Sequence, residues 1–151
     1  MKKITLALFV LLFSVSVHAQ ITSPVKWNYT AKKIAVGIYE LHITATIEPK
    51  WHIYSQDAGE GPVPTSIAID KNPLITLDGK ITELGKLQKE YSKVFSSTLK
   101  FYSNKVDFVQ KIKLKTTVNT IAKGKVTFMV CNDEKCLAPS TIPFSIKINA
   151  K

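Results

Sequence analysis

The fold class is indicated most clearly by residues 39–47, which read Tyr-Glu-Leu-His-Ile-Thr-Ala-Thr-Ile. Apolar side chains occupy every second position, and polar side chains fill all four positions between them. Such an alternation turns one face of an extended strand toward a core and the other face toward solvent. This stretch therefore predicts a half-buried β-strand.

The same period of two recurs along the rest of the chain. Further alternating segments lie at 25–29, 106–115, 126–131 and 142–148. No segment longer than one turn has an amphipathic helical pattern. Turn-forming residues are found between the expected strands, at 57–64, 72–73, 78–80, 103–105 and 123–125. We therefore expect an all-β domain of two packed antiparallel sheets, with Pro143 at an edge strand or at its entry.

Residues 1–19 have the features of a secretory signal peptide. Two lysines precede an apolar run at 4–17, and Ala19 provides the small residue before a cut ahead of Gln20. The run is too short to span a bilayer comfortably, and Gln20 cannot carry a lipid as a cysteine could. We expect residues 20–151 to form a single domain in the bacterial periplasm, without membrane insertion.

The positive charge of the chain comes from lysine alone. The formal net charge is +10, and the sequence contains no arginine. Arginine supplies most bidentate contacts to bases and phosphates, so we do not expect nucleic-acid binding. We interpret the lysines as a solvated surface, with steering of acidic partners as the alternative. Common phosphate-loop, hydrolase and metalloprotease motifs are missing, and no cofactor is expected.

Cys131 and Cys136 are the only two cysteines in the chain. In an oxidising periplasm such a pair closes into a disulfide. Closing so short a loop stabilises a fold by only about 2 kcal/mol in the chain-entropy model. A short disulfide with charged residues in its loop therefore suits reversible thiol exchange better than reinforcement. The alternative is a structural bond that closes a loop.

Three segments together resemble a known family. They are Trp51-His-Ile-Tyr-Ser-Gln56, Gly-Pro-Val-Pro-Thr at 61–65, and the cysteine segment at 126–139. They resemble the N-terminal periplasmic domain of the thiol:disulfide interchange protein DsbD, over nearly all of 20–151. The resemblance implies an immunoglobulin-like β-sandwich with protein-disulfide reductase activity. This chain departs from the best-known members in having four residues between its cysteines instead of five.

The resemblance also implies partners. The two cysteines would accept electrons from a thioredoxin-like domain and deliver them to periplasmic oxidoreductases or cytochrome c maturation proteins. Full-length members continue into a membrane-embedded electron carrier and a thioredoxin-like domain. Because this chain stops at Lys151, we expect it to meet such partners as separate proteins. The competing hypothesis is a non-catalytic immunoglobulin-like interaction domain with an inert disulfide.

Residue roles follow from the same resemblance. Cys136 is expected to exchange with partners, and Cys131 to resolve the mixed disulfide. His52 and Tyr54 are expected to wall the disulfide, with packing of their neighbours in the core as the alternative. A cap aromatic is expected to shield the disulfide from unwanted thiols.

Tyr91 is the first candidate for the cap aromatic and Phe95 the second. The alternative for residues 90–95 is a surface loop with one core aromatic. A zinc site built from the two cysteines with His42 and His52 is not expected, because nothing in the spacing brings either histidine close. His42 is expected to be simply solvated.

Overall fold

The computed structural model describes residues 23–150, which form eleven β-strands and contain no helix. Residues 23–150 therefore contain no helix long and apolar enough to cross a membrane. The signal peptide expected at 1–19 lies outside the described residues.

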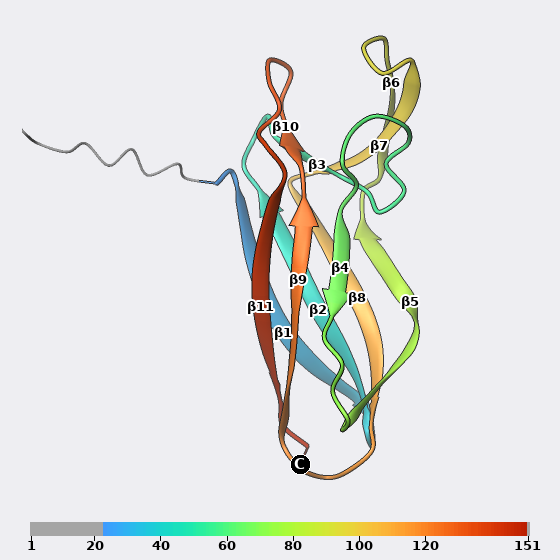
Figure 1. The fold of residues 1–151 in the computed structure, drawn as a ribbon, viewed down its shortest axis with the longest axis vertical. Coiled ribbons are helices and arrows are strands. Elements are labelled where there is room, and N and C mark those ends of the chain that lie inside the picture. Colours follow the sequence, from blue (N-terminus) through green and yellow to red (C-terminus); the bar gives the residue numbers. More distant parts are fainter. Residues whose placement is uncertain (1–22, 151) are drawn as a thin grey trace, which may run out of the picture.

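Two antiparallel sheets make up the body of the domain. One sheet has four strands in the order β1 (Val25–Ala35), β2 (Ile38–Ile47), β8 (Lys105–Leu114) and β5 (Ile75–Gly85). The other has three strands in the order β11 (Ser140–Ile148), β9 (Thr120–Phe128) and β4 (Ser66–Ile69). Figure 1 shows β11, β9 and β4 in front of β1, β2 and β8. The two sheets form the predicted antiparallel β-sandwich.

The core lies between these two sheets. The apolar positions of 39–47 are buried, which confirms the strand predicted from their alternation. Phe108 of β8 is fully buried on the same side, and Phe128 and Phe144 face it from the second sheet. Trp27 lies between the layers, with its ring centroid 6.1 Å from Phe108 and 5.1 Å from Phe128. Burial of these large apolar side chains is the main source of stability.

A third sheet, which the sequence pattern did not predict, covers one end of the sandwich. Its order is β10 (Val130–Cys131), β3 (His52–Tyr54), β7 (Ser97–Ser103) and β6 (Gln88–Ser92). The chain leaves β9 at Phe128 and pairs with β3 from Val130 onward, so it changes partner within one alternating stretch. In Figure 1 these short strands gather at the end opposite the C-terminus.

Two predicted turns are strand segments in the structure. Residues 123–125 lie inside β9, where a Cβ on Gly124 would collide with the Ala68 carbonyl and the Phe144 ring. That glycine is needed for close approach of neighbours. Residues 78–80 lie inside β5, at a register shift. The turn at 103–105 is confirmed by Asn104, which has a φ of 66° between β7 and β8, and Pro143 does lie on the edge strand β11.

The expectation that His42 is simply solvated is wrong. Its Nδ1 lies 2.7 Å from Oδ2 of Asp107, and its side chain is 19% exposed. Thr44 Oγ1 donates a hydrogen bond of 2.9 Å to the other oxygen of Asp107. The pairing of Thr44 with Asp107 across β2 and β8 brings this carboxylate beside the histidine. Local sequence alternation does not reveal such a partner.

Candidate functional site

The two cysteines form a disulfide at the end of the sandwich, with 4.0 Å between their Cα atoms. Cys131 is only 1% exposed and packs in a small cluster with Tyr54, Ala58 and Leu99. Cys136 follows the charged loop and is exposed. One sulfur-bearing residue is therefore held inside the domain while the other is presented to solvent.

The loop between the cysteines is a hairpin with its own hydrogen bonds. The Asn132 amide donates to the Lys135 carbonyl at 2.9 Å, and the Leu137 amide donates to the Val130 carbonyl at 2.9 Å. The side-chain oxygen of Asn132 accepts from the amides of Glu134 at 3.0 Å and Lys135 at 2.8 Å. An asparagine in this role fixes a tight turn. These bonds close the loop independently of the bond between the sulfur atoms.

The short strand β3 brings His52 next to the disulfide. His52 lies directly opposite Cys131 in the antiparallel pairing of β3 and β10, and directly opposite side chains share one face of a sheet. The His52 ring centroid lies 4.5 Å from that of Phe101 and 5.4 Å from that of Tyr54. The register of β3 against β10 therefore places His52 beside Cys131, although their separation along the sequence did not indicate this. Ile53, between the two, points into the main core.

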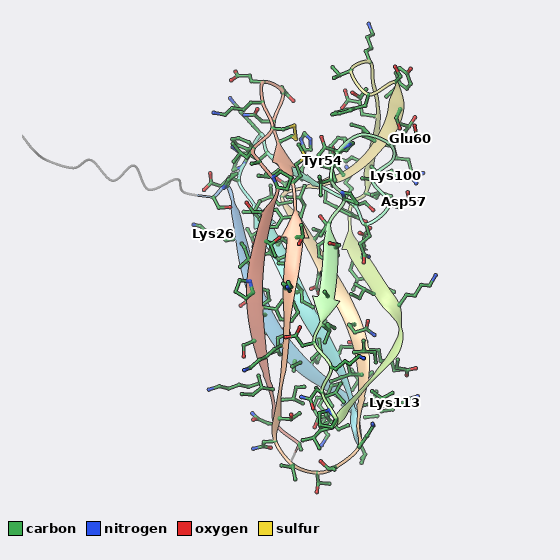
Figure 2. The ribbon with its side chains drawn as sticks, in the orientation of Figure 1. Lys26, Tyr54, Asp57, Glu60, Lys100 and Lys113 are labelled. Carbon is green, nitrogen blue, oxygen red and sulfur yellow. A yellow bond between two sulfur atoms is a disulfide. The ribbon has the colours of Figure 1, made fainter. Side chains whose placement is uncertain are left out.

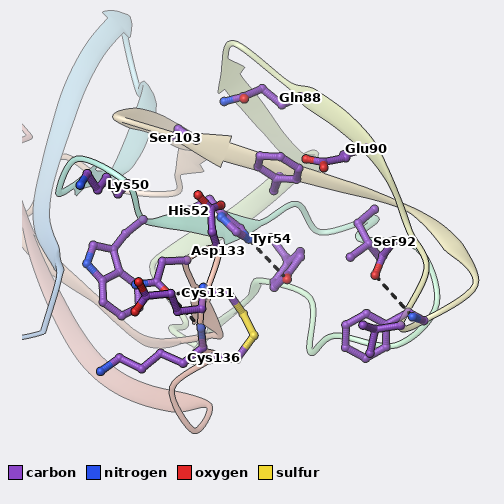
Figure 3. Close-up of a pocket in the computed structure, with 18 of the residues that line it drawn as sticks. Lys50, His52, Tyr54, Gln88, Glu90, Ser92, Ser103, Cys131, Asp133 and Cys136 are labelled. Atoms are coloured by element: carbon purple, nitrogen blue, oxygen red, sulfur yellow. Dashed lines mark hydrogen bonds between the residues drawn. A yellow bond between two sulfur atoms is a disulfide. The ribbon is translucent and has the colours of Figure 1, made fainter.

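All six residues singled out from the sequence line one groove of about 660 Å³. The cysteine loop forms one wall, and the hairpin of β6 and β7 forms the other. Figure 3 shows the disulfide, His52 and Glu90 around this groove. The six residues are Cys131, Cys136, His52, Tyr54, Tyr91 and Phe95.

The two cap candidates differ in their packing. Tyr91 lies on β6 and is 62% exposed. Phe95 is partly buried and packs against the small cluster that contains Cys131. Gly61 has a φ of 118°, and a Cβ there would collide with the Phe95 ring. The loop before β4 therefore closes tightly on Phe95 and leaves Tyr91 free at the rim.

The electrostatics of the groove are set by burial and by acidic residues. Burial lowers the pKa of His52 below its ordinary value, and the negative charges of Asp133 and Glu90 offset part of this effect. Burial also raises the pKa of Tyr54. His52 is consequently neutral at pH 7 and able to accept a proton.

Sequence reasoning missed Glu83, which ties the site to the sandwich. Its Oε2 accepts hydrogen bonds from the hydroxyls of Ser55 and Tyr102, both at 2.8 Å, and its Oε1 accepts from the Gln56 amide at 2.6 Å. Burial and the hydrogen bond to Glu83 strongly raise the pKa of Tyr102. One acidic residue in an alternating strand gives no signal for this role. Phe101, the aromatic neighbour of His52, was also missed, because the contact depends on the pairing of β3 with β7.

A second support comes from the loop that follows β3. The Lys100 ammonium pairs with Asp57, and the Glu60 amide donates to Ser97 Oγ at 3.1 Å. Figure 2 shows Tyr54, Asp57, Glu60 and Lys100 near one end of the molecule, with Lys113 far away at the other. Within residues 23–150 no group of three or more histidine, cysteine and acidic side chains is arranged to hold a metal ion.

The fold and the site together define an immunoglobulin-like β-sandwich domain with a disulfide in a groove at one end. The sequence matches the family described as thiol:disulfide interchange protein DsbD, N-terminal, over residues 20–147. The chain therefore belongs to this family. No curated protein sequence gives a significant match.

Solved structures share the fold at low sequence identity. The N-terminal periplasmic domain of ScsB from Proteus mirabilis has a TM-score of 0.54 and 15% identity, over 86% of this chain and 49% of that one. This chain thus spans about half of the ScsB structure. The reduced N-terminal domain of DsbD from Neisseria meningitidis has a TM-score of 0.53 and 14% identity, over 82% of this chain and 86% of that one. The same Neisseria domain in complex with the N-terminal domain of PilB has a TM-score of 0.52 and 11% identity, over 83% and 87%.

Proposed function

We propose that the Cys131–Cys136 disulfide exchanges with thioredoxin-like proteins, and that Cys136 is the residue that partners attack. The observation that carries this proposal is the difference in exposure, since Cys136 is exposed and Cys131 is 1% exposed. Attack on a disulfide requires a thiolate to reach one sulfur. In this proposal a large partner therefore reaches the bond from the Cys136 side.

The exchange has two steps. A partner thiolate attacks Sγ of Cys136, a mixed disulfide forms, and Cys131 leaves as a thiolate that takes up a proton. The second partner thiolate then attacks the partner's own sulfur, which releases Cys136 and leaves the partner oxidised. The domain has gained two electrons, and the same steps in reverse pass them to an acceptor.

We assign donors and acceptors by chemical class. A thioredoxin-like protein or a membrane electron carrier supplies the electrons, and periplasmic oxidoreductases or cytochrome c maturation proteins receive them. The Neisseria relative bound to the PilB domain supports a protein partner. In this proposal residues 20–151 act as one domain in the periplasm after removal of 1–19, and the periplasmic description of the ScsB relative supports that location.

The groove gives the exchange its selectivity. Asp133 and Glu134 lie in the loop between the cysteines and disfavour a thiolate there, while Lys135 offsets part of their charge. Tyr91 and Phe95 shield the disulfide from small thiols. Two poorly nucleophilic thiols would then wait for a partner that docks and activates them.

A redox titration against glutathione tests the proposal. We expect a reduction potential in the range of exchange proteins, which extends from about −270 to about −120 mV. A value well below about −300 mV would mark a structural bond. That result would favour the non-catalytic interaction domain instead.

A further inference from the structure

Cys131 presents a problem of proton transfer that the exchange steps leave open. Its thiol must lose a proton each time the disulfide closes and regain one each time it opens. At 1% exposure, Cys131 has almost no direct contact with bulk water. Burial also disfavours the thiolate form. A neighbouring group that carries this proton would speed both directions of the exchange.

His52 is placed for that task by the strand pairing. Its side chain lies directly opposite Cys131, and Cβ atoms in such pairs are about 4.5–5.5 Å apart. His52 is only partly buried, and it lines the groove. In Figure 3 the His52 ring lies beside Tyr54, above the disulfide in the view. His52 therefore lines the groove from the same face of the sheet as the buried Cys131.

The other titratable groups around the groove are less suited. The Tyr54 hydroxyl lies 3.5 Å from Nε2 of His52, but burial raises the pKa of this hydroxyl, so it is a poor acid or base near pH 7. Carboxylates are weaker bases than imidazole, and an ammonium group has no lone pair to accept a proton. The remaining charged groups that line the groove are Lys50, Glu90, Asp133, Glu134 and Lys135.

We propose that His52 carries the proton of Cys131. This inference rests on the proposed function. In the closing direction a partner sulfur is bonded to Cys136, and neutral His52 accepts the proton of the Cys131 thiol. The Cys131 thiolate attacks Sγ of Cys136, the disulfide forms, and the partner leaves as a thiolate. The two cysteines are oxidised as the partner is reduced. In the opening direction protonated His52 returns the proton to Cys131.

The environment of His52 sets the pH dependence of closing. Burial lowers its pKa below 6.5, against the opposing charges of Asp133 and Glu90. The accepting form is the neutral ring, so the closing rate should rise with pH through this pKa and reach a plateau below about pH 7. Without His52, closing would depend on direct loss of the thiol proton. It would then continue to rise through and beyond the ordinary thiol pKa of about 8.5, because burial disfavours the Cys131 thiolate.

The test follows closing of the reduced protein with excess oxidised glutathione. Acid quenching and mass spectrometry separate the glutathione adduct from the closed disulfide. At pH 7 we expect His52→Gln to slow closing at least about tenfold, below the usual 10²–10⁴ range for acid–base catalysis. The first attack by Cys136 should change less than about twofold. His42→Gln is the matched control, because His42 is hydrogen-bonded to Asp107 on another sheet. This substitution should change neither rate.

Equal closing rates for the wild type and His52→Gln would overturn the inference. Where His52→Gln fails to fold, the wild-type pH profile decides, and a profile without a plateau below pH 7 would also overturn it. The glutathione assay requires no protein partner. A domain that exchanges with thioredoxin-like proteins but closes independently of His52 contradicts the inference alone. A domain that closes through His52 but exchanges with no thioredoxin-like protein contradicts only the proposed function.

Discussion

Cys131 and Cys136 are joined by one bond but belong to different environments. Cys131 is 1% exposed, beside Tyr54 and Leu99, whereas Cys136 is exposed on a charged hairpin. The hairpin is closed by backbone hydrogen bonds and by the Asn132 side chain. We therefore expect both cysteines to stay in place when the disulfide opens, as repeated exchange requires.

We predict that the reduced protein stays folded. The main core lies between the two large sheets and does not include the disulfide, which contributes only about 2 kcal/mol. A folded domain is typically stable by about 5–15 kcal/mol. Thermal unfolding with and without reductant measures this, and we expect a lower but clear cooperative transition after reduction. Complete unfolding at ambient temperature on reduction would favour a structural disulfide.

Substitution of the cap aromatics should speed reduction by a small thiol such as dithiothreitol. Phe95 packs against the cluster that contains Cys131, so Phe95→Ala should have a several-fold effect. Tyr91→Ala should also accelerate the reaction, but by less than Phe95→Ala, because Tyr91 is 62% exposed. The reduction potential should hardly change, since a cap controls access.

Val94→Ala is the matched control for this series, because Val94 lies on the same hairpin and is 87% exposed. It should leave the rate unchanged. Unchanged rates for both aromatic variants would show that neither Tyr91 nor Phe95 shields the disulfide.

Much of the sandwich could be predicted from alternation alone. The buried positions of 39–47 and the edge position of Pro143 follow from local pattern. The third sheet does not, because the alternation of 126–131 continues unbroken while the chain changes its strand partner at Met129. Strands of two or three residues, such as β10 and β3, are held by pairing between distant segments.

The candidate site was predictable in parts. The cysteines and the segment around His52 were indicated by residue type and by family resemblance. The direct pairing of His52 with Cys131 required a strand register that no local pattern encodes. The same limit explains Glu83 and Asp107, whose partners lie on strands distant in sequence.

Loss of Glu83 should destabilise the domain and loosen the site. Its carboxylate accepts three hydrogen bonds that join β5 to the third sheet and to the loop after β3. Glu83→Ala should lower the free energy of unfolding by at least about 2 kcal/mol. The hydroxyls of Ser55 and Tyr102 and the amide of Gln56 would lose their charged acceptor. Urea unfolding provides the measurement. Glu48→Ala, at an exposed position, should change stability little. Equal effects of the two substitutions would show that the hydrogen bonds to Glu83 contribute nothing to stability.

The central claim is that partners form a mixed disulfide with Cys136. The most direct measurement is covalent trapping by a thioredoxin-like protein, read on a non-reducing gel and by mass spectrometry. Cys131→Ser should accumulate a long-lived complex, because the thiol that resolves the mixed disulfide is missing. Cys136→Ser should not, because the remaining Cys131 is buried. Trapping mainly with Cys136→Ser would reverse the assignment. Trapping with neither variant, while a known exchange protein is trapped, would contradict the account.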